Sequence, residues 1–181
     1  PGSSDEWAVP VMDRIHPSMQ SLRDAILVIS RQPKSLSSSL GHRAMDNHPF
    51  ASSRYRQARK NLAEVLEALS SGDFDRLGDI AENEALSLHA LLMTSGDGAL
   101  LMKPGTLEAI GHIREARLQG LPVFFTLDAG PNIHLFYPEQ DSRRVGSFIT
   151  DALAPLCAGK EVILDRCGKG PRPLRAEPST P

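Results

Sequence analysis

The sequence has few cysteines, no long apolar stretch and no large excess of charge of either sign. Two of its 181 residues are cysteine, too few for the disulfide framework of a small secreted domain, and we interpret both as structural or incidental thiols. No apolar run approaches the ~20 residues that span a bilayer, and no secretory signal opens the chain. A net charge of −2 gives no bulk attraction to nucleic acid or to an anionic membrane. We therefore expect a cytoplasmic protein without nucleic-acid or membrane partners.

Motifs that hold metals or nucleotide phosphates are also missing. The histidines lack metal-ligand spacing and no cysteine accompanies them, so we predict no metal site. The segment Gly96–Gly98 is too short for a phosphate loop, and its acidic residue would repel phosphate. The segment Gly168–Gly170 is followed by proline instead of a helix start. The sequence thus contains no recognisable ATP-binding loop.

What the chain does contain is regular apolar patterning. Short β-branched or aromatic runs indicate strands, and apolar residues at three- and four-residue steps indicate helices. The resulting order predicts the α+β class, with a ferredoxin-like split β-α-β antiparallel sheet and additional helices on one face. The predicted strands are 24–30, 123–127, 133–137 and 161–164, and the predicted helices are 52–69, 74–93, 104–119 and 145–156.

The length suits one domain with tails. We assign 24–167 to that domain. Segment 1–23 is interpreted as a linker or the remnant of a preceding domain, because the chain starts with Pro-Gly-Ser-Ser and lacks an initiator Met. Segment 168–181 is rich in proline, glycine and basic residues, and we predict that it is a disordered tail.

The most distinctive segment is Asp128-Ala129-Gly130-Pro131-Asn132, which separates the two predicted hairpin strands. Gly-Pro-Asn between apolar runs is typical of a tight turn. Asp and Asn also close turns through their own side chains, so the residue types alone are compatible with a purely structural role. The position of Asp128 at the mouth of a hairpin equally allows it to face a ligand.

This segment resembles the signature of the diphosphomevalonate decarboxylases, which belong to the superfamily of small-molecule kinases that includes galactokinase, homoserine kinase and mevalonate kinase. Further stretches resemble the same family in the same order, and the resemblance covers about 7–171. These stretches are Ala25–Ser30, Ser37–His42, His48–Phe50, Phe74–Gly78, Glu84–Ala90, Met93–Ser95 and Lys103–Leu107.

The resemblance implies the C-terminal, substrate-binding half of an ATP-dependent decarboxylase. Such an enzyme, a carbon–carbon lyase, converts 5-diphosphomevalonate into isopentenyl diphosphate, ADP, phosphate and CO2 in the mevalonate pathway of isoprenoid biosynthesis. ATP and Mg²⁺ are bound mainly by the N-terminal half, which is absent, so we expect this fragment to be inactive alone. A homodimer is usual in the family.

The resemblance also assigns roles to individual residues. Asp128 is the expected catalytic carboxylate, either the base for the substrate 3-hydroxyl or the group that orients it. Some members carry Arg where this chain has Ser39. This chain therefore lacks one fixed positive charge at that position, and a monophosphate substrate remains an alternative to the diphosphate. The expected substrate-binding residues are Ser37, Ser38, Ser39, His42, Gly130 and Asn132.

Two other functions remain open. A phosphomevalonate decarboxylase of the same family would use the monophosphate. A non-catalytic ferredoxin-like module would bind a ligand or partner on its sheet, and Asp128 would be dispensable for that role. Retention of Asp128 argues, by analogy, for decarboxylation over the members that only phosphorylate.

Overall fold

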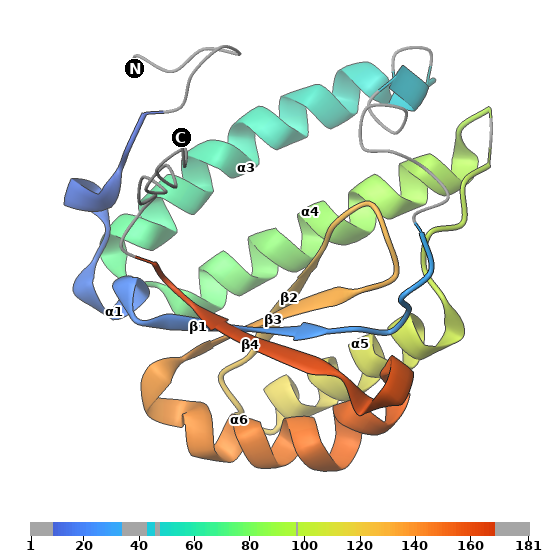
Figure 1. Cartoon of the computed structure of the whole chain (residues 1–181). Coiled ribbons are helices and arrows are strands. Elements are labelled where there is room, and N and C mark those ends of the chain that lie inside the picture. The colour runs from blue at the N-terminus through green and yellow to red at the C-terminus, as the bar shows by residue number, and fades with distance from the viewer. Residues whose placement is uncertain (1–8, 34–42, 46–47, 97, 169–181) are drawn as a thin grey trace, which may run out of the picture.

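The computed structural model describes residues 9–33, 43–45, 48–96 and 98–168 of the chain. Within them, four strands form one antiparallel sheet in the order β2-β3-β1-β4. The sheet and the helices that pack on it confirm the predicted α+β class (Figure 1). The strands are β1 (Leu22–Leu27), β2 (Phe124–Leu127), β3 (Ile133–Pro138) and β4 (Val162–Arg166).

The helices begin and end where local chemistry favours it. Helix α3 ends at Gly72, whose φ of 78° lies in the left-handed region that glycine adopts without strain. Asp73 then caps α4, because its side chain accepts a hydrogen bond from the Arg76 backbone N–H at 3.0 Å. Pro104 occupies the first turn of α5. The helices are α1 (Pro17–Gln20), α3 (Ala51–Ser71), α4 (Phe74–Thr94), α5 (Pro104–Leu118) and α6 (Ser142–Phe148).

Helices cover both faces of the sheet, with α3 and α4 on one side and α5 and α6 on the other (Figure 1). Phe125 and Leu135 point to the face of α5 and α6 and are fully buried. Phe124 and Phe136 point to the opposite face, where their rings stack at 5.3 Å and join the cluster that contains Leu77 of α4. The predicted arrangement places the additional helices on one face only. Successive strand residues point to opposite faces of the sheet, and here both sets of side chains are apolar, so both faces must be covered by helices.

The last predicted helix is interrupted in the structure. Helix α6 gives way to a π-helical turn, η3 (Ile149–Leu153), and a short 3-10 turn, η4 (Ala154–Leu156). Pro155 lies in this region and lacks the N–H that a continuous α-helix requires. A further 3-10 turn, η5 (Ala158–Lys160), leads into β4. No helix in the described part of the chain is both long and apolar enough to cross a membrane.

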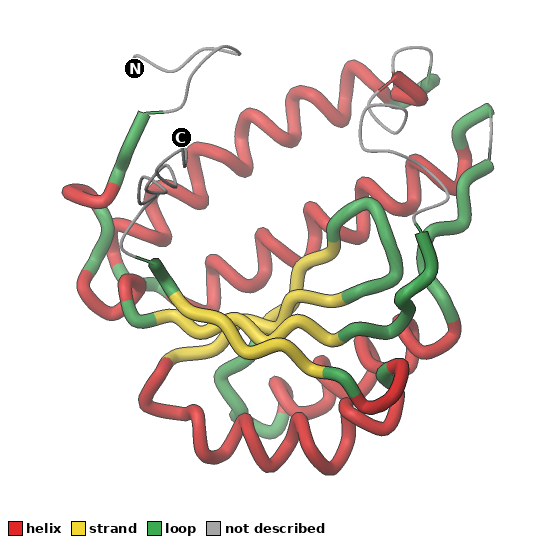
Figure 2. Tube along the Cα trace, in the orientation of Figure 1, coloured by secondary structure: helices red, strands yellow, loops and turns green. Residues whose placement is uncertain are grey.

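The register of β2 and β3 positions the Asp128 segment. Leu127 pairs with Ile133, so residues 128–132 form the whole connection between the two strands. Loops gather at this end of the sheet (Figure 2). The loop that follows β1 and the loop that precedes α5 border the same small hollow as the β2–β3 connection.

Candidate functional site

The β2–β3 connection carries Asp128, and its backbone is fixed from inside the protein. The Asp128 carbonyl accepts a hydrogen bond from the Gly130 N–H at 2.7 Å and another from Nε2 of His89 at 3.1 Å. His89 lies on α4 and is only 1% exposed. A donor that is itself held in the core restricts the positions available to the peptide that it binds.

Two further hydrogen bonds anchor the rest of the connection. The Thr106 hydroxyl donates to the Pro131 carbonyl at 2.7 Å and accepts from the Lys103 N–H at 3.1 Å. Thr106 belongs to α5 and is fully buried. The Asn132 Oδ1 accepts from the backbone N–H of Ser30 at 3.0 Å. The connection is therefore tied to α4, to α5 and to the segment after β1.

A hollow of about 170 Å³ lies beside this connection. Lys103 is at its margin, and its Nζ donates to Oε1 of Gln32 at 3.2 Å. A lysine ammonium in this position favours an anionic group, because ionised donors and acceptors form stronger hydrogen bonds than neutral ones. Lys103 belongs to the stretch Lys103–Leu107 that resembles the family, but the resemblance gives it no role. The lining residues are Ser30, Gln32, Pro33, Leu100, Leu101, Lys103, Ala129, Gly130 and Pro131.

The Asp128 side chain is exposed, whereas its neighbour Ala129 packs against the apolar cluster that contains Leu92 and Leu101. The backbone is thus held while the carboxylate stays accessible to a ligand.

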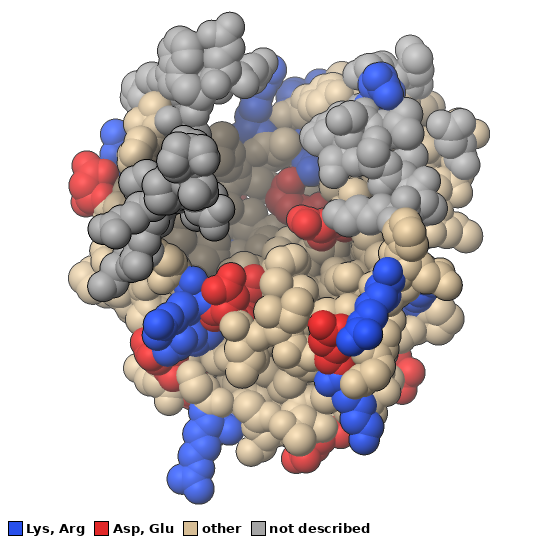
Figure 3. Space-filling view, in the orientation of Figure 1, with Lys and Arg blue, Asp and Glu red and all other residues tan. Residues whose placement is uncertain are grey.

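The molecule is hollowed between α3 and the sheet, and acidic and basic side chains line the walls (Figure 3).

Burial lowers the pKa of His89 below its usual value, and the hydrogen bond to the Asp128 carbonyl opposes that shift. The imidazole is therefore neutral at pH 7, with its proton on Nε2, because a carbonyl only accepts. His89 is thus a packing residue of the core that also holds the Asp128 connection through a hydrogen bond.

Four predicted substrate-binding residues lie outside the described residues: Ser37, Ser38, Ser39 and His42. The described chain before them ends at Pro33, which lines the hollow beside the Asp128 connection. Gly130 is buried in the connection and Asn132 is half-buried. Their observed contacts hold the turn, and a role in substrate binding stays a prediction for all six residues.

One histidine–carboxylate hydrogen bond and one ion pair were not anticipated from the sequence. His134 Nδ1 on β3 lies 2.8 Å from Asp24 Oδ2 on β1. Arg54 of α3 donates two hydrogen bonds to Glu84 of α4, at 3.0 and 2.6 Å. Both contacts depend on strand pairing or on interhelical packing, so no local pattern of the sequence indicates them. The charge of Arg54 is neutralised locally by Glu84.

Within the described residues, no three His, Cys, Asp or Glu side chains are close enough to hold a metal ion. Mg²⁺ usually keeps several waters and is held by one or two carboxylates together with substrate phosphates.

A comparison with models of protein families shows to which family the chain belongs. The model of the mevalonate 5-diphosphate decarboxylase C-terminal domain matches residues 25–174. The chain belongs to this family. The resemblance inferred from the Asp128 segment is therefore confirmed.

Two curated decarboxylases of this family show how the chain relates to whole enzymes. The phosphomevalonate decarboxylase of Haloferax volcanii is 30% identical over 109 residues, which are 60% of this chain and 33% of that protein. The diphosphomevalonate decarboxylase mvd1 of Aspergillus fumigatus is 28% identical over 161 residues, 86% of this chain and 39% of that protein. The chain thus spans well under half the length of these relatives.

Solved decarboxylase structures share the fold. Mevalonate diphosphate decarboxylase from Staphylococcus aureus matches with a TM-score of 0.77 and 25% identity, covering 90% of this chain and 48% of that one. A structure described as MDDEF in complex with MVAPP, AMPPCP and magnesium matches with a TM-score of 0.72 and 26% identity, covering 82% of this chain and 46% of that one.

Proposed function

We propose that this chain forms the C-terminal half of the active site of an ATP-dependent diphosphomevalonate decarboxylase. The complete enzyme, a carbon–carbon lyase, would convert 5-diphosphomevalonate into isopentenyl diphosphate, ADP, phosphate and CO2. The observation that carries the proposal is Asp128, an exposed carboxylate on a connection that is hydrogen-bonded to three separate segments, twice through its backbone and once through the Asn132 side chain. A related structure that contains MVAPP, AMPPCP and magnesium supports the set of ligands.

In this proposal Asp128 acts on the tertiary 3-hydroxyl of the substrate. Its carboxylate accepts or orients the hydroxyl proton, and its negative charge stabilises the positive charge that develops at the substrate carbon. Both effects require accurate placement of the carboxylate. The buried donor His89 contributes to that placement through the Asp128 carbonyl.

The anionic end of the substrate is assigned to the neighbouring loops. We propose that hydroxyl and backbone donors of Ser37, Ser38 and Ser39, together with His42, bind the diphosphate. The described hollow borders the start of that loop and carries the Lys103 ammonium at its margin, which supports an anionic ligand there. Gly130 would allow close backbone approach and Asn132 would fix the turn. ATP and Mg²⁺ would bind mainly to an N-terminal half, so we propose that this chain alone is inactive.

The test is turnover by a full-length enzyme in which this chain follows an N-terminal half of the family. With ATP, Mg²⁺ and diphosphomevalonate, release of phosphate and CO2 is measured for the wild type and for Asp128→Asn. We expect Asp128→Asn to lower kcat at least ~100-fold, the scale of general acid–base catalysis. Asp151→Asn, a change at an exposed position of η3, should leave the rate unaltered. Equal rates for the Asp128→Asn variant and the wild type would remove Asp128 from the mechanism.

A monophosphate substrate is the second candidate, and two observations favour considering it. The Haloferax volcanii relative is a phosphomevalonate decarboxylase, and Ser39 stands where some members carry Arg. Parallel kcat/KM measurements with 5-phosphomevalonate and 5-diphosphomevalonate decide between the two. A higher value for the monophosphate would replace the diphosphate in our proposal.

We also propose, from the resemblance alone, that the complete enzyme is a cytoplasmic homodimer. Light scattering of the full-length enzyme after size-exclusion chromatography should give twice the mass of one chain. A monomer mass across the micromolar range would contradict the homodimer.

A further inference from the structure

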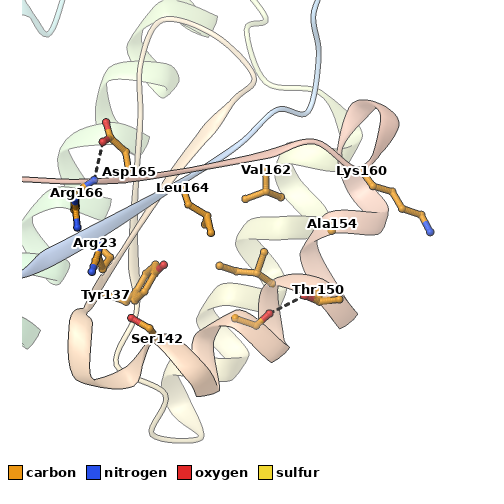
Figure 4. A pocket seen from close by; sticks show the side chains of 12 residues that line it. Arg23, Tyr137, Ser142, Thr150, Ala154, Lys160, Val162, Leu164, Asp165 and Arg166 are labelled. Carbon is orange, nitrogen blue, oxygen red and sulfur yellow. Dashed lines mark hydrogen bonds between the residues drawn. The ribbon is translucent and has the colours of Figure 1, made fainter.

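A second and larger cavity lies beneath β4, away from Asp128. It has a volume of about 900 Å³, within the range of cavities that hold small organic ligands. Its walls come from β4, β1 and β3 on one side and from α6 and η3 on the other (Figure 4). Because β4 and β2 are the opposite edges of the sheet, this cavity is separate from the site at the end of β2.

Because of the strand register, the strand side of the cavity has polar side chains at one end and apolar side chains along the rest. Arg166, Arg23 and Tyr137 are successive cross-strand partners on β4, β1 and β3, so they form one polar row. Leu164 and Val162 stand two and four residues before Arg166 on the same face of β4 and continue the wall as apolar side chains. The close view shows this order, with Arg23, Arg166 and Tyr137 at one end and Leu164 and Val162 beside them (Figure 4).

The polar end holds two guanidinium groups on neighbouring strands. Like charges directly opposite each other in a sheet are destabilising. Arg23 is paired with Glu139, whereas Arg166 has no ion pair within the described part of the chain. Lys160 also lines the cavity, but its side chain extends away from the others (Figure 4). Asp165 also lines the cavity, but its Oδ1 accepts a hydrogen bond from the Arg166 backbone N–H at 2.7 Å and its side chain points away from Tyr137 (Figure 4). The Arg166 guanidinium is therefore available to a bound anion.

The Tyr137 hydroxyl adds a donor at the same end. Tyr137 is only 5% exposed and lines the cavity, and its hydroxyl makes no hydrogen bond to another described residue. The hydroxyl oxygen itself is not fully buried, so it is open to a ligand in the cavity. Burial raises the pKa of Tyr137 above its usual value, so the phenol stays protonated at neutral pH and can donate to an anion.

We propose that this cavity binds an amphiphilic organic anion. Its phosphate or carboxylate head group lies against Arg166, Arg23 and the Tyr137 hydroxyl. Its apolar chain lies along Leu164, Val162 and Ile149 of η3. The turn that presents Ile149 is π-helical, and such turns are frequent at functional sites.

Octyl phosphate and octanoate are suitable probes, used with the 181-residue chain below their critical micelle concentrations. Amide chemical shifts are followed by 1H–15N NMR, with inorganic phosphate and octan-1-ol as the two halves of the ligand. We expect at least one amphiphile to cause saturable chemical-shift changes at cavity residues. Inorganic phosphate and octan-1-ol should each bind at least tenfold more weakly than that amphiphile. Whichever of octyl phosphate and octanoate binds more tightly shows whether the site prefers a phosphate or a carboxylate head group. No saturable shift with either amphiphile overturns the proposal.

Three variants separate a built site from non-specific adsorption. Tyr137→Phe keeps the ring and should weaken binding about tenfold, since it removes one hydrogen bond to a charged group. Gly146→Leu should abolish binding, because Gly146 lines the cavity and no atom lies within 4 Å of a Cβ built there. The matched control is Gly111→Leu on α5, which has the same open space and lies outside the cavity. Equal affinity in the Gly146→Leu and Gly111→Leu variants contradicts the site.

Discussion

The hydrogen bond from His89 to the Asp128 carbonyl can be tested by His89→Leu. Leucine keeps much of the buried volume and removes the Nε2 donor. His89 is 1% exposed, and its Nε2 lies 3.1 Å from the carbonyl oxygen. The carbonyl keeps the Gly130 N–H at 2.7 Å, so the variant loses one net hydrogen bond and does not leave the oxygen unsatisfied. That loss is about 1 kcal/mol, and imperfect repacking adds up to about 1.5 kcal/mol.

The assay is urea unfolding at pH 7, and we expect His89→Leu to lower the free energy of unfolding by about 1–2.5 kcal/mol. His89→Gln places an amide donor near the position of Nε2 and should recover a large part of the loss. His112→Leu is the control, because His112 lies on the exposed surface of α5 and should change stability by less than about 0.5 kcal/mol.

The pH dependence gives an independent check. The pKa of folded His89 is lowered by burial, so the unfolded chain binds a proton first as the pH falls below about 6.5. The stability that neutral His89 contributes is present above that pH and is lost as the pH falls through the folded pKa. The difference between the wild type and His89→Leu should therefore shrink between pH 7 and pH 5. A constant difference, or a Gln variant as unstable as the Leu variant, would refute the reasoning.

Two further predictions concern packing and buried charge. Gly78→Ala should lower stability by about 1–3 kcal/mol, because the new Cβ would lie 2.8 Å from the Phe124 Cβ. In the control Gly111→Ala no atom lies within 4 Å of the new Cβ, so stability should rise by about 0.5–1 kcal/mol. Thermal unfolding measures both variants, and equal changes of the melting temperature would contradict the role of the contact with Phe124. Arg117→Met should cost about 2–4 kcal/mol at pH 7, because Arg117 lies 3.5 Å from the buried Glu82 carboxylate. Burial raises the pKa of Glu82 and Arg117 opposes that shift, so the loss of Arg117 raises the pKa of Glu82 further. Protonation of the carboxyl at low pH removes the unpaired buried charge, so urea unfolding should show a smaller loss of stability in Arg117→Met at pH 4.5 than at pH 7. A loss of stability that grows towards low pH would contradict this prediction.

The sequence by itself determined the class of the fold, the family and most of the elements, the interrupted last helix excepted. The periodicity of apolar residues indicates a helix, and its ends are set by local signals. These signals are Gly72, Asp73 and Pro104, so the helix ends could be predicted from neighbouring residues in the chain. The Asp128–Asn132 segment was recognisable as a hairpin turn for the same reason. Family membership also followed, because many short stretches agree in order.

Only the tertiary structure decided which residues meet. The contacts of His89 and Thr106 with the Asp128 connection join positions 25 or more apart in the chain, and no local pattern encodes such a distance. The row of Arg166, Arg23 and Tyr137 likewise exists only once three strands are in register. Helix cover on both faces of the sheet depends on how apolar side chains from distant segments share space, since close packing is a property of the assembled core.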